Sequence, residues 1–245
     1  MSVDEQIPRI IHYCWFGRGD KPKKIVKCMR SWAKQLNGYR FVEWNEDNFD
    51  VNAVPYVKEA YEARKFAFVS DYVRLHALYQ VGGIYLDTDV EVIRPLDAFL
   101  ENSAFSGFED EHFLQSGTMG AIPGHPWIQR LLDDYQQRSF LLEDETYDMT
   151  TNTAVISRIC KEEGLQLNGQ LQALPNGVVF YPRTYFSPYD YINGGSYLTE
   201  DSHTIHHFAQ SWLPARVRAR SSLKRMLSKV AGPRMVSIVR KMFTV

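Results

Sequence analysis

The stretch FAFVSDYVRLHALYQVGGIYLDTDVEVIRPL, residues 66–96, predicts a helix, a tight turn and a buried strand in succession. Its first half is helix-forming, and Gly82-Gly83 ends that helix in the manner of a C-cap. The apolar residues 84–86 then lead directly into Asp87-Thr88-Asp89. Open α/β sheets bind ligands at the carboxyl ends of their strands, so this order predicts a functional site at the two aspartates.

The segments around this stretch indicate an α/β fold with a mostly parallel sheet. Residues 9–16 and 39–44 are rich in β-branched and aromatic residues, and between them residues 21–36 carry apolar residues at helical spacing. This βαβ order favours parallel strands with helices on the faces of the sheet. We further expect helices over 55–80 (two segments), 126–138 and 151–163, strands over 178–181 and 204–208, and an irregular segment over 182–202 that could cover a cleft.

The composition is that of a globular protein with one main core. The 245 residues suit a single domain, and 44% of them are hydrophobic. The three cysteines show no CxxC or Cys/His spacing, so we expect neither a disulfide framework nor a zinc site. No run of 18 apolar residues occurs, and the N-terminus is acidic where a secretory signal is basic and apolar. These features predict a cytoplasmic location.

The charge of the chain is divided between an acidic body, residues 1–212, and a basic tail, residues 213–245. The tail holds nine Lys and Arg residues and no acidic residue, and its apolar residues recur at helical spacing on both sides of Gly232-Pro233. Basic amphipathic helices of this kind bind anionic membranes. The alternatives are packing on the acidic body or on another subunit, and a solvated tail. Nucleic-acid binding is not expected, because the body is acidic and no aromatic residues alternate with the basic ones.

The two aspartates offer ligands to one divalent cation. Two carboxylates one residue apart can both turn toward a hard ion, which can in turn bind a diphosphate and make it a better leaving group. Asp71 and Arg74 lie three residues apart on the preceding helix and therefore share one of its faces. Without the neighbouring motif, they would be interpreted as a surface ion pair.

Three segments together resemble glycosyltransferase family 32: IPRIIHYCWFG (7–17), the block from residue 70 to 89, and HHFAQSW (206–212). The chain also resembles the catalytic core of the large clostridial glucosylating toxins. The resemblance implies a GT-A fold, which is a Rossmann-like nucleotide-sugar-binding fold, with residues 1–212 as the catalytic domain. Asp87-Thr88-Asp89 is then the DXD motif of the family.

The resemblance also implies roles for individual residues. Mn²⁺ or Mg²⁺ would be bound by Asp87, Asp89 and His206, with Asp89 as the more direct ligand and Asp87 also contacting the ribose and the sugar. His206 is preferred to His207 because neighbouring residues of a strand face opposite sides. The catalytic residues would be Asp87, Asp89 and Arg74. The donor would be bound by Trp15, Asp71, Arg74, Tyr85, Asp87, Ser211 and Trp212.

Trp15 bears on the choice of donor. In the toxin-like relatives an aromatic residue stacks on the nucleobase at this position, which favours a UDP-sugar donor with a GDP-sugar as the alternative. Core packing is the other interpretation of this tryptophan. In the loop 115–126, Gln115, Ser116 and His125 are candidates for sugar or acceptor contacts, and turns alone would explain its glycines equally well.

The implied reaction is the transfer of a hexose, with retention of anomeric configuration, to a saccharide acceptor. We expect a lipid-linked acceptor in the synthesis of capsule or lipopolysaccharide, at the inner face of the cell membrane. No general base is evident, and no spacing selects one among Glu109, Asp110 and Glu111. Two other classes remain: a phosphatase or phosphomutase of the haloacid dehalogenase type, and a non-catalytic nucleotide-sugar-binding module.

Overall fold

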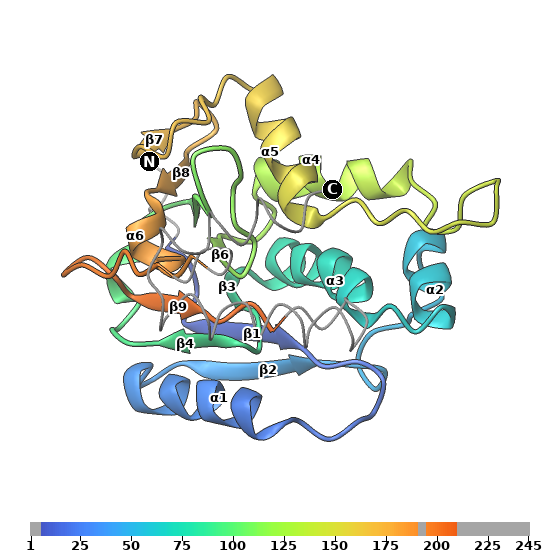
Figure 1. Ribbon diagram of the computed structural model, residues 1–245, viewed down its shortest axis with the longest axis horizontal. Helices are drawn as coiled ribbons and strands as arrows, with labels where there is room; N and C mark the ends of the chain where they lie inside the picture. The colour runs from blue at the N-terminus through green and yellow to red at the C-terminus, as the bar shows by residue number, and fades with distance from the viewer. Residues whose placement is uncertain (1–5, 191–194, 210–245) are drawn as a thin grey trace, which may run out of the picture.

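The computed structural model describes residues 6–190 and 195–209, which form a central sheet covered by helices (Figure 1). The sheet has the strand order β2-β1-β3-β6-β5-β8-β7. Strands β2, β1, β3, β5 and β8 run in one direction, and only β6 and β7 run against them, which confirms the mostly parallel sheet. The strands are β1 (Ile10–Cys14), β2 (Arg40–Trp44), β3 (Gly83–Leu86), β5 (Ala104–Gly107), β6 (Thr118–Ala121), β7 (Gln172–Ala173) and β8 (Val178–Tyr181).

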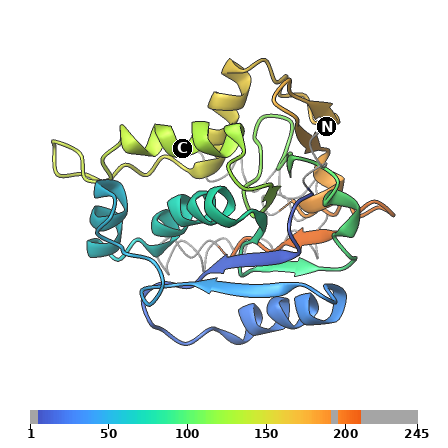
Figure 2. The same cartoon turned by 180° about the vertical axis from the view of Figure 1, so that it is seen from behind.

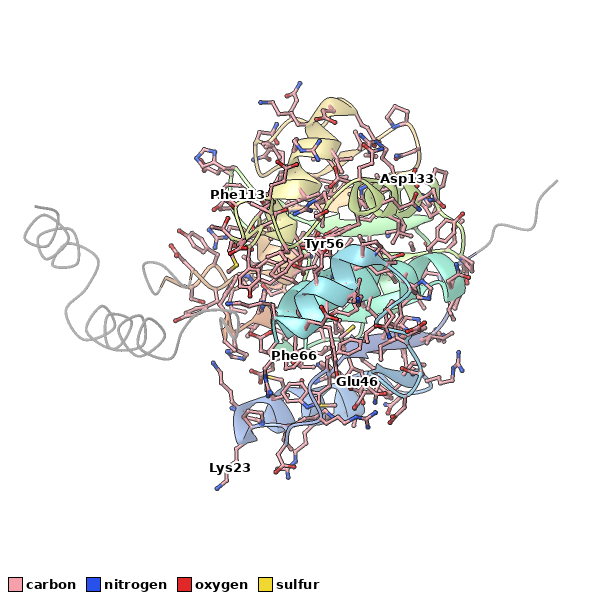
Figure 3. All side chains as sticks on the ribbon, turned by 90° about the vertical axis from the view of Figure 1, so that its right-hand side faces the viewer. Lys23, Glu46, Tyr56, Phe66, Phe113 and Asp133 are labelled. Atoms are coloured by element: carbon pink, nitrogen blue, oxygen red, sulfur yellow. The ribbon has the colours of Figure 1, made fainter. Side chains whose placement is uncertain are left out.

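The helices cover both faces of this sheet (Figures 1 and 2). Ile84 and Leu86 of β3 pack in one hydrophobic cluster with Trp32 of α1, whereas Tyr85 packs in the other with residues of α2 to α5, as the alternation of a strand requires. In Figure 3, Lys23 at the start of α1 projects away from the rest of the protein. The helices are α1 (Lys23–Gln35), α2 (Pro55–Glu62), α3 (Phe66–Val81), α4 (Pro126–Gln136), α5 (Asn152–Glu162) and the short α6 (Arg183–Phe186), with a 3-10 turn at Asp97–Phe99.

A second, two-stranded sheet was only half predicted. Strand β9 (Thr204–His206) lies where the pattern predicts a strand, and it pairs antiparallel with β4 (Val90–Val92), which the sequence analysis did not identify. The indole Nε1 of Trp32 donates to the Val90 carbonyl at 2.8 Å, and the Val92 amide donates to the Ser31 hydroxyl at 2.9 Å. These bonds attach β4 to α1 rather than to the main sheet.

The glycine pair ends α3 as predicted. Gly82 has a φ of 66° and donates its amide to the Leu78 carbonyl at 2.9 Å. A Cβ at this position would lie 2.6 Å from the Pro123 ring, so both the left-handed conformation and the packing require glycine. The chain can therefore turn from α3 into β3 without a loop, which fixes where Asp87 emerges.

The expectation of an irregular segment over 182–202 needs one change, because residues 183–186 form α6. Ser211, Trp212 and the predicted helical tail, residues 213–245, lie outside the described residues. Among the helices that the structure describes, none has the length and hydropathy needed to cross a membrane.

The buried side chain of His12 links β1 to β2 and to the turn between α3 and β3. His12 of β1 accepts a hydrogen bond at Nδ1 from the Trp44 indole at 3.0 Å, and its Nε2 lies 2.8 Å from the Gly82 carbonyl oxygen. These partners require the neutral ring with the proton on Nε2, because protonated Nδ1 would face the indole N–H. Burial lowers the pKa of His12 to about 4.

We predict that His12 makes the fold sensitive to mild acid. The unfolded chain takes up a proton near pH 6.5 and the folded chain only near pH 4, so stability is complete above pH 6.5 and falls as the pH decreases between these values. Between pH 7.5 and pH 5 this contributes a loss of about 2 kcal/mol. Urea unfolding of His12→Gln should show a correspondingly smaller pH dependence than the wild type. The exposed control His112→Gln should retain the wild-type dependence, and an unchanged slope in His12→Gln would contradict the assignment.

Candidate active site

Several chain segments meet at one edge of the main sheet. Strands β1, β3, β5 and β8 end there, and β6 begins there because it runs in the opposite direction. This edge therefore gathers Trp15 after β1, Asp87 after β3, and Ser116 and Gly117 before β6. The pairing of β4 with β9 adds His206, which lies opposite Val90.

Asp87, Asp89 and His206 form the group best suited to bind a cation. One ligand atom from each of the three lies within 4.8 Å of the others. His206 Nε2 is 3.2 Å from an oxygen of Asp89 and 3.9 Å from one of Asp87. The second oxygen of Asp89 accepts the Ala209 amide at 2.6 Å, which fixes the orientation of the carboxylate. The sequence-predicted metal residues are therefore brought together.

The surroundings of these three side chains fit a divalent ion. Two carboxylates and an imidazole are ligands that Mn²⁺ and Mg²⁺ accept. His206 Nδ1 is buried without a hydrogen-bond partner among the described residues. A Cβ at Gly117 would lie 3.1 Å from Asp87 Oδ2 and 3.1 Å from His206 Nδ1, so the absence of a side chain there leaves this space open. Gly117 was not predicted from the sequence, although it belongs to the small-residue loop that was noted.

His206 and His207 face different partners, as strand alternation predicts. Burial disfavours a charged His206, but the carboxylates of Asp89 and Asp87 outweigh it and raise the pKa of His206 to about 9. His207 Nε2 instead lies 2.8 Å from Glu91, outside the group of three. The two neighbours thus provide a matched pair for experiments.

Arg74 connects the helix to this site through a buried guanidinium. It donates to the Asp71 carboxylate at 2.7 Å, to the Ser116 carbonyl at 2.8 Å and to the Ser70 carbonyl at 3.2 Å, and its Nη2 lies 3.3 Å from Asp87. Burial disfavours its charge, but Asp87, Tyr85 and Asp71 hold the pKa of Arg74 above its usual value. The Arg74 side chain is only 5% exposed, so the interpretation of Asp71 and Arg74 as a surface pair is wrong.

Tyr85 contacts the same carboxylate oxygen of Asp87 as Arg74 does. Its hydroxyl donates to Asp87 Oδ1 at 2.9 Å, and the Arg74 guanidinium lies 4.6 Å from the centre of its ring. Tyr85 is 1% exposed. Arg74 and Tyr85 thus orient one DXD carboxylate from within the protein, a positioning role that the sequence alone did not separate from donor contact.

Trp15 lies at the same edge, half-buried. Its Nε1 donates to the Gly19 carbonyl at 2.6 Å, and the Lys21 ammonium lies 5.3 Å from the ring centre. The ring is thus held in place at the end of β1 while part of it faces solvent. Its stacking on a nucleobase remains a prediction, as do the donor contacts of Asp71, Arg74 and Tyr85.

The other candidates of the loop 115–126 have different places. The side chain of Gln115 bonds both the amide and the carbonyl of Thr118 and is buried, so it shapes the loop. Ser116 contacts Arg74 through its carbonyl and hydroxyl. His125 follows the end of β6 and caps α4, accepting the Trp127 amide at 3.2 Å. Because β6 runs away from the site, His125 lies at the opposite edge of the sheet, which contradicts the expectation that it contacts the sugar or the acceptor.

We predict that Arg74→Met strongly destabilises the fold, because Asp71 and Asp87 would lose their buried cation. Removing one partner of a buried ion pair costs about 3–5 kcal/mol. The matched control is Arg158→Met, since Arg158 also contacts two carboxylates but is 50% exposed, and its loss should stay below about 1 kcal/mol. Equal losses for the two variants in urea unfolding would show that the Arg74 network adds little.

Comparison with known proteins agrees with this geometry. Residues 22–106 match the family model described as the glycosyltransferase sugar-binding region containing the DXD motif. The chain is 29% identical over 138 residues to inositol phosphoceramide mannosyltransferase 3 of Schizosaccharomyces pombe, covering 55% of this chain and 38% of the relative. It is 25% identical over 187 residues to inositol phosphoceramide mannosyltransferase 2 of the same yeast, covering 74% and 52%. The chain thus spans about half the length of these relatives or less.

A solved structure supports the fold independently of close sequence similarity. The PaToxG glycosyltransferase aligns with a TM-score of 0.50 at 16% identity, covering 65% of this chain and 71% of that chain. At this identity the likeness concerns the fold alone, and it agrees with the GT-A arrangement. Residues 22–106, which include Asp87-Thr88-Asp89, are therefore similar to the DXD-containing sugar-binding region of glycosyltransferases, and they lie on a GT-A fold.

Proposed function

We propose that the protein is a metal-dependent glycosyltransferase that transfers a sugar from a nucleoside diphosphate donor. The observation that carries this proposal is the group formed by Asp87, Asp89 and His206 at the edge of the sheet where the DXD motif emerges. Two carboxylates and an imidazole would hold one divalent cation, with Asp89 as the more direct ligand. When bound, such an ion supplies positive charge for the departing diphosphate.

The surrounding residues prepare the site before the donor arrives. Arg74 and Tyr85 hold Asp87, and the Ala209 amide holds Asp89, so both carboxylates are oriented in advance. Gly117 leaves room between Asp87 and His206. Trp15 would stack on the base, Asp71 would contact the donor sugar, and Ser211 and Trp212 would contact the phosphates.

The chemistry of transfer in this proposal retains the anomeric configuration. A front-face reaction, in which the leaving phosphate helps to remove the proton of the acceptor hydroxyl, needs no protein nucleophile. We propose a UDP-sugar as the donor because of Trp15. Guanosine donors belong in every test, since relatives of this chain are mannosyltransferases.

We propose a saccharide acceptor linked to a lipid, in surface polysaccharide synthesis at the inner face of the cell membrane. The names of the two yeast relatives join mannose transfer to inositol phosphoceramide, which is a lipid, and this supports a lipid-linked acceptor. The basic amphipathic pattern of residues 213–245 supports contact with an anionic membrane. Capsule or lipopolysaccharide as the product remains part of the same proposal.

The two rival classes are less well supported. A phosphatase of the haloacid dehalogenase type and a non-catalytic binding module would both keep acidic residues at a strand end. The match of residues 22–106 to a glycosyltransferase region favours sugar transfer over phosphomonoester hydrolysis. A binding module would not need Asp87, Asp89 and His206 together.

We predict that Asp89→Asn slows Mn²⁺-dependent release of nucleoside diphosphate from a panel of UDP- and GDP-sugars by roughly 100-fold or more. The fold should survive, because the asparagine oxygen can still accept the Ala209 amide. Asp133→Asn on α4 is the control and should retain wild-type turnover, since in the part of the chain that the structure describes this carboxylate accepts a hydrogen bond from Gln129 alone. A wild-type protein that neither binds nor turns over any sugar nucleotide would refute the proposal, and hydrolysis of phosphomonoesters would favour the phosphatase.

The histidine pair tests the third ligand without any assay of turnover. Mn²⁺ binding, followed by electron paramagnetic resonance, should weaken by about 10- to 100-fold in His206→Asn. His207→Asn should bind Mn²⁺ as the wild type does, because His207 faces Glu91. The opposite result, with His207→Asn as the weaker binder, would exclude His206 as a ligand.

A further inference from the structure

Two oppositely charged side chains lie beyond the ends of neighbouring strands without forming an ion pair. Strands β5 and β8 run parallel, and their last paired residues are Gly107 and Tyr181. Glu109 and Arg183 each follow two residues later, so both emerge at the edge of the sheet that carries Asp87. In the part of the chain that the structure describes, no salt bridge joins them within 4 Å.

The Glu109 carboxylate is partly buried and has no hydrogen-bond or salt-bridge partner within residues 6–190 and 195–209. Its backbone amide donates to the Phe113 carbonyl at 2.8 Å, but its side chain makes no hydrogen bond with any described residue. Buried carboxylates ordinarily have such partners. Burial raises the pKa of Glu109 to about 7, and the charges that act on it include His206, Asp110, Arg183 and Asp87. The carboxylate thus lies close enough to the metal group, which is the cluster of Asp87, Asp89 and His206, to interact with its charges.

The two following acids differ from Glu109. Asp110 accepts the amides of His112 and Phe113 at 2.7 and 2.9 Å and therefore closes the turn. Glu111 is exposed. The three acids, which the sequence did not distinguish, therefore have different surroundings. Of the three, Glu109 is the one that combines a partly buried carboxylate with no hydrogen-bond partner among the described residues.

The Arg183 guanidinium likewise has a hydrogen-bond donor that no described residue accepts. Its Nε is buried without a hydrogen-bond partner among the described residues, and its guanidinium carbon lies 4.3 Å from the centre of the Tyr197 ring. Tyr197 is 46% exposed. The Arg183 guanidinium thus stacks on the Tyr197 ring, and its charge acts on the Glu109 carboxylate. A ring can pack on the C–H face of a sugar, while the carboxylate accepts and the guanidinium donates hydrogen bonds at its hydroxyls.

The position of these side chains along the sheet edge is informative. The strand order places Trp15 at the end of β1, the metal group beside β3 and β6, and Glu109 and Arg183 beyond β5 and β8. A donor with its base at Trp15 and its diphosphate at the metal group would therefore direct its sugar toward Glu109 and Arg183.

We propose that Glu109 and Arg183, with Tyr197, form a subsite for a hexose ring in which Glu109 accepts and Arg183 donates hydrogen bonds at neighbouring hydroxyls. This inference rests on the proposed function. The donor sugar and the acceptor sugar share the chemistry that the subsite recognises, so the experiment must separate them.

The test compares Glu109→Gln and Arg183→Met with the exposed control Glu111→Gln. Three quantities are measured: affinity for UDP or GDP in the presence of Mn²⁺, hydrolysis of the matching nucleotide sugar without acceptor, and transfer to free glucose, galactose or mannose. Nucleoside diphosphates lack the sugar, so their affinity should stay within about twofold in all variants. Loss of a hydrogen bond to a charged group should lower kcat/KM for the sugar reactions by roughly 10- to 100-fold.

The pattern of losses identifies the sugar. Reduced hydrolysis together with reduced transfer assigns the subsite to the donor sugar, and reduced transfer with normal hydrolysis assigns it to the acceptor. Unchanged hydrolysis and transfer in both variants would overturn the subsite while leaving the glycosyltransferase intact. An equal loss of nucleoside diphosphate affinity would also overturn it, since that result indicates a structural role. A wild-type protein without Mn²⁺-dependent nucleotide binding would remove the proposed function itself.

Discussion

The buried guanidinium of Arg74 is the contact on which the site depends. A cation at this depth is tolerated only when carboxylates and carbonyls surround it, and these come from α3, from the end of β3 and from the loop before β6. The same contacts orient Asp87. The Arg74 guanidinium thus stabilises the junction between α3 and the sheet and also positions Asp87, a candidate metal ligand.

The small β4–β9 sheet supplies the other half of the site. It brings residues more than 110 positions apart into register, with Val90 opposite His206, and Trp32 and Ser31 of α1 hold β4 in place. His206 reaches Asp89 through this pairing, while His207 turns toward Glu91. The candidate ligand set is consequently assembled from two distant motifs by backbone hydrogen bonds rather than by a single local loop.

The proposed binding sites follow the order of the strands along one edge of the sheet. Base recognition at Trp15, cation binding at β3 and β6, and sugar recognition at β5 and β8 would follow one another along neighbouring strands. The antiparallel β6 serves this arrangement, because its reversed direction brings Ser116 and Gly117, rather than the end of the strand, to the site. A side chain at Gly117 would occupy the space between Asp87 and His206.

The sequence by itself indicated helices α1 to α5 and the identity of the main motif, but not strands β4 to β7. Gly82-Gly83 had to end a helix, the apolar residues 84–86 had to be a buried strand, and two aspartates at its end indicated a cation site, because these depend on backbone preference and periodicity. Only the tertiary structure decided that Arg74 is buried, that Glu109 differs from Asp110 and Glu111, and that His125 lies at the far edge. Burial, strand direction and the pairing of β4 with β9 are set by contacts between distant segments, which no local pattern encodes.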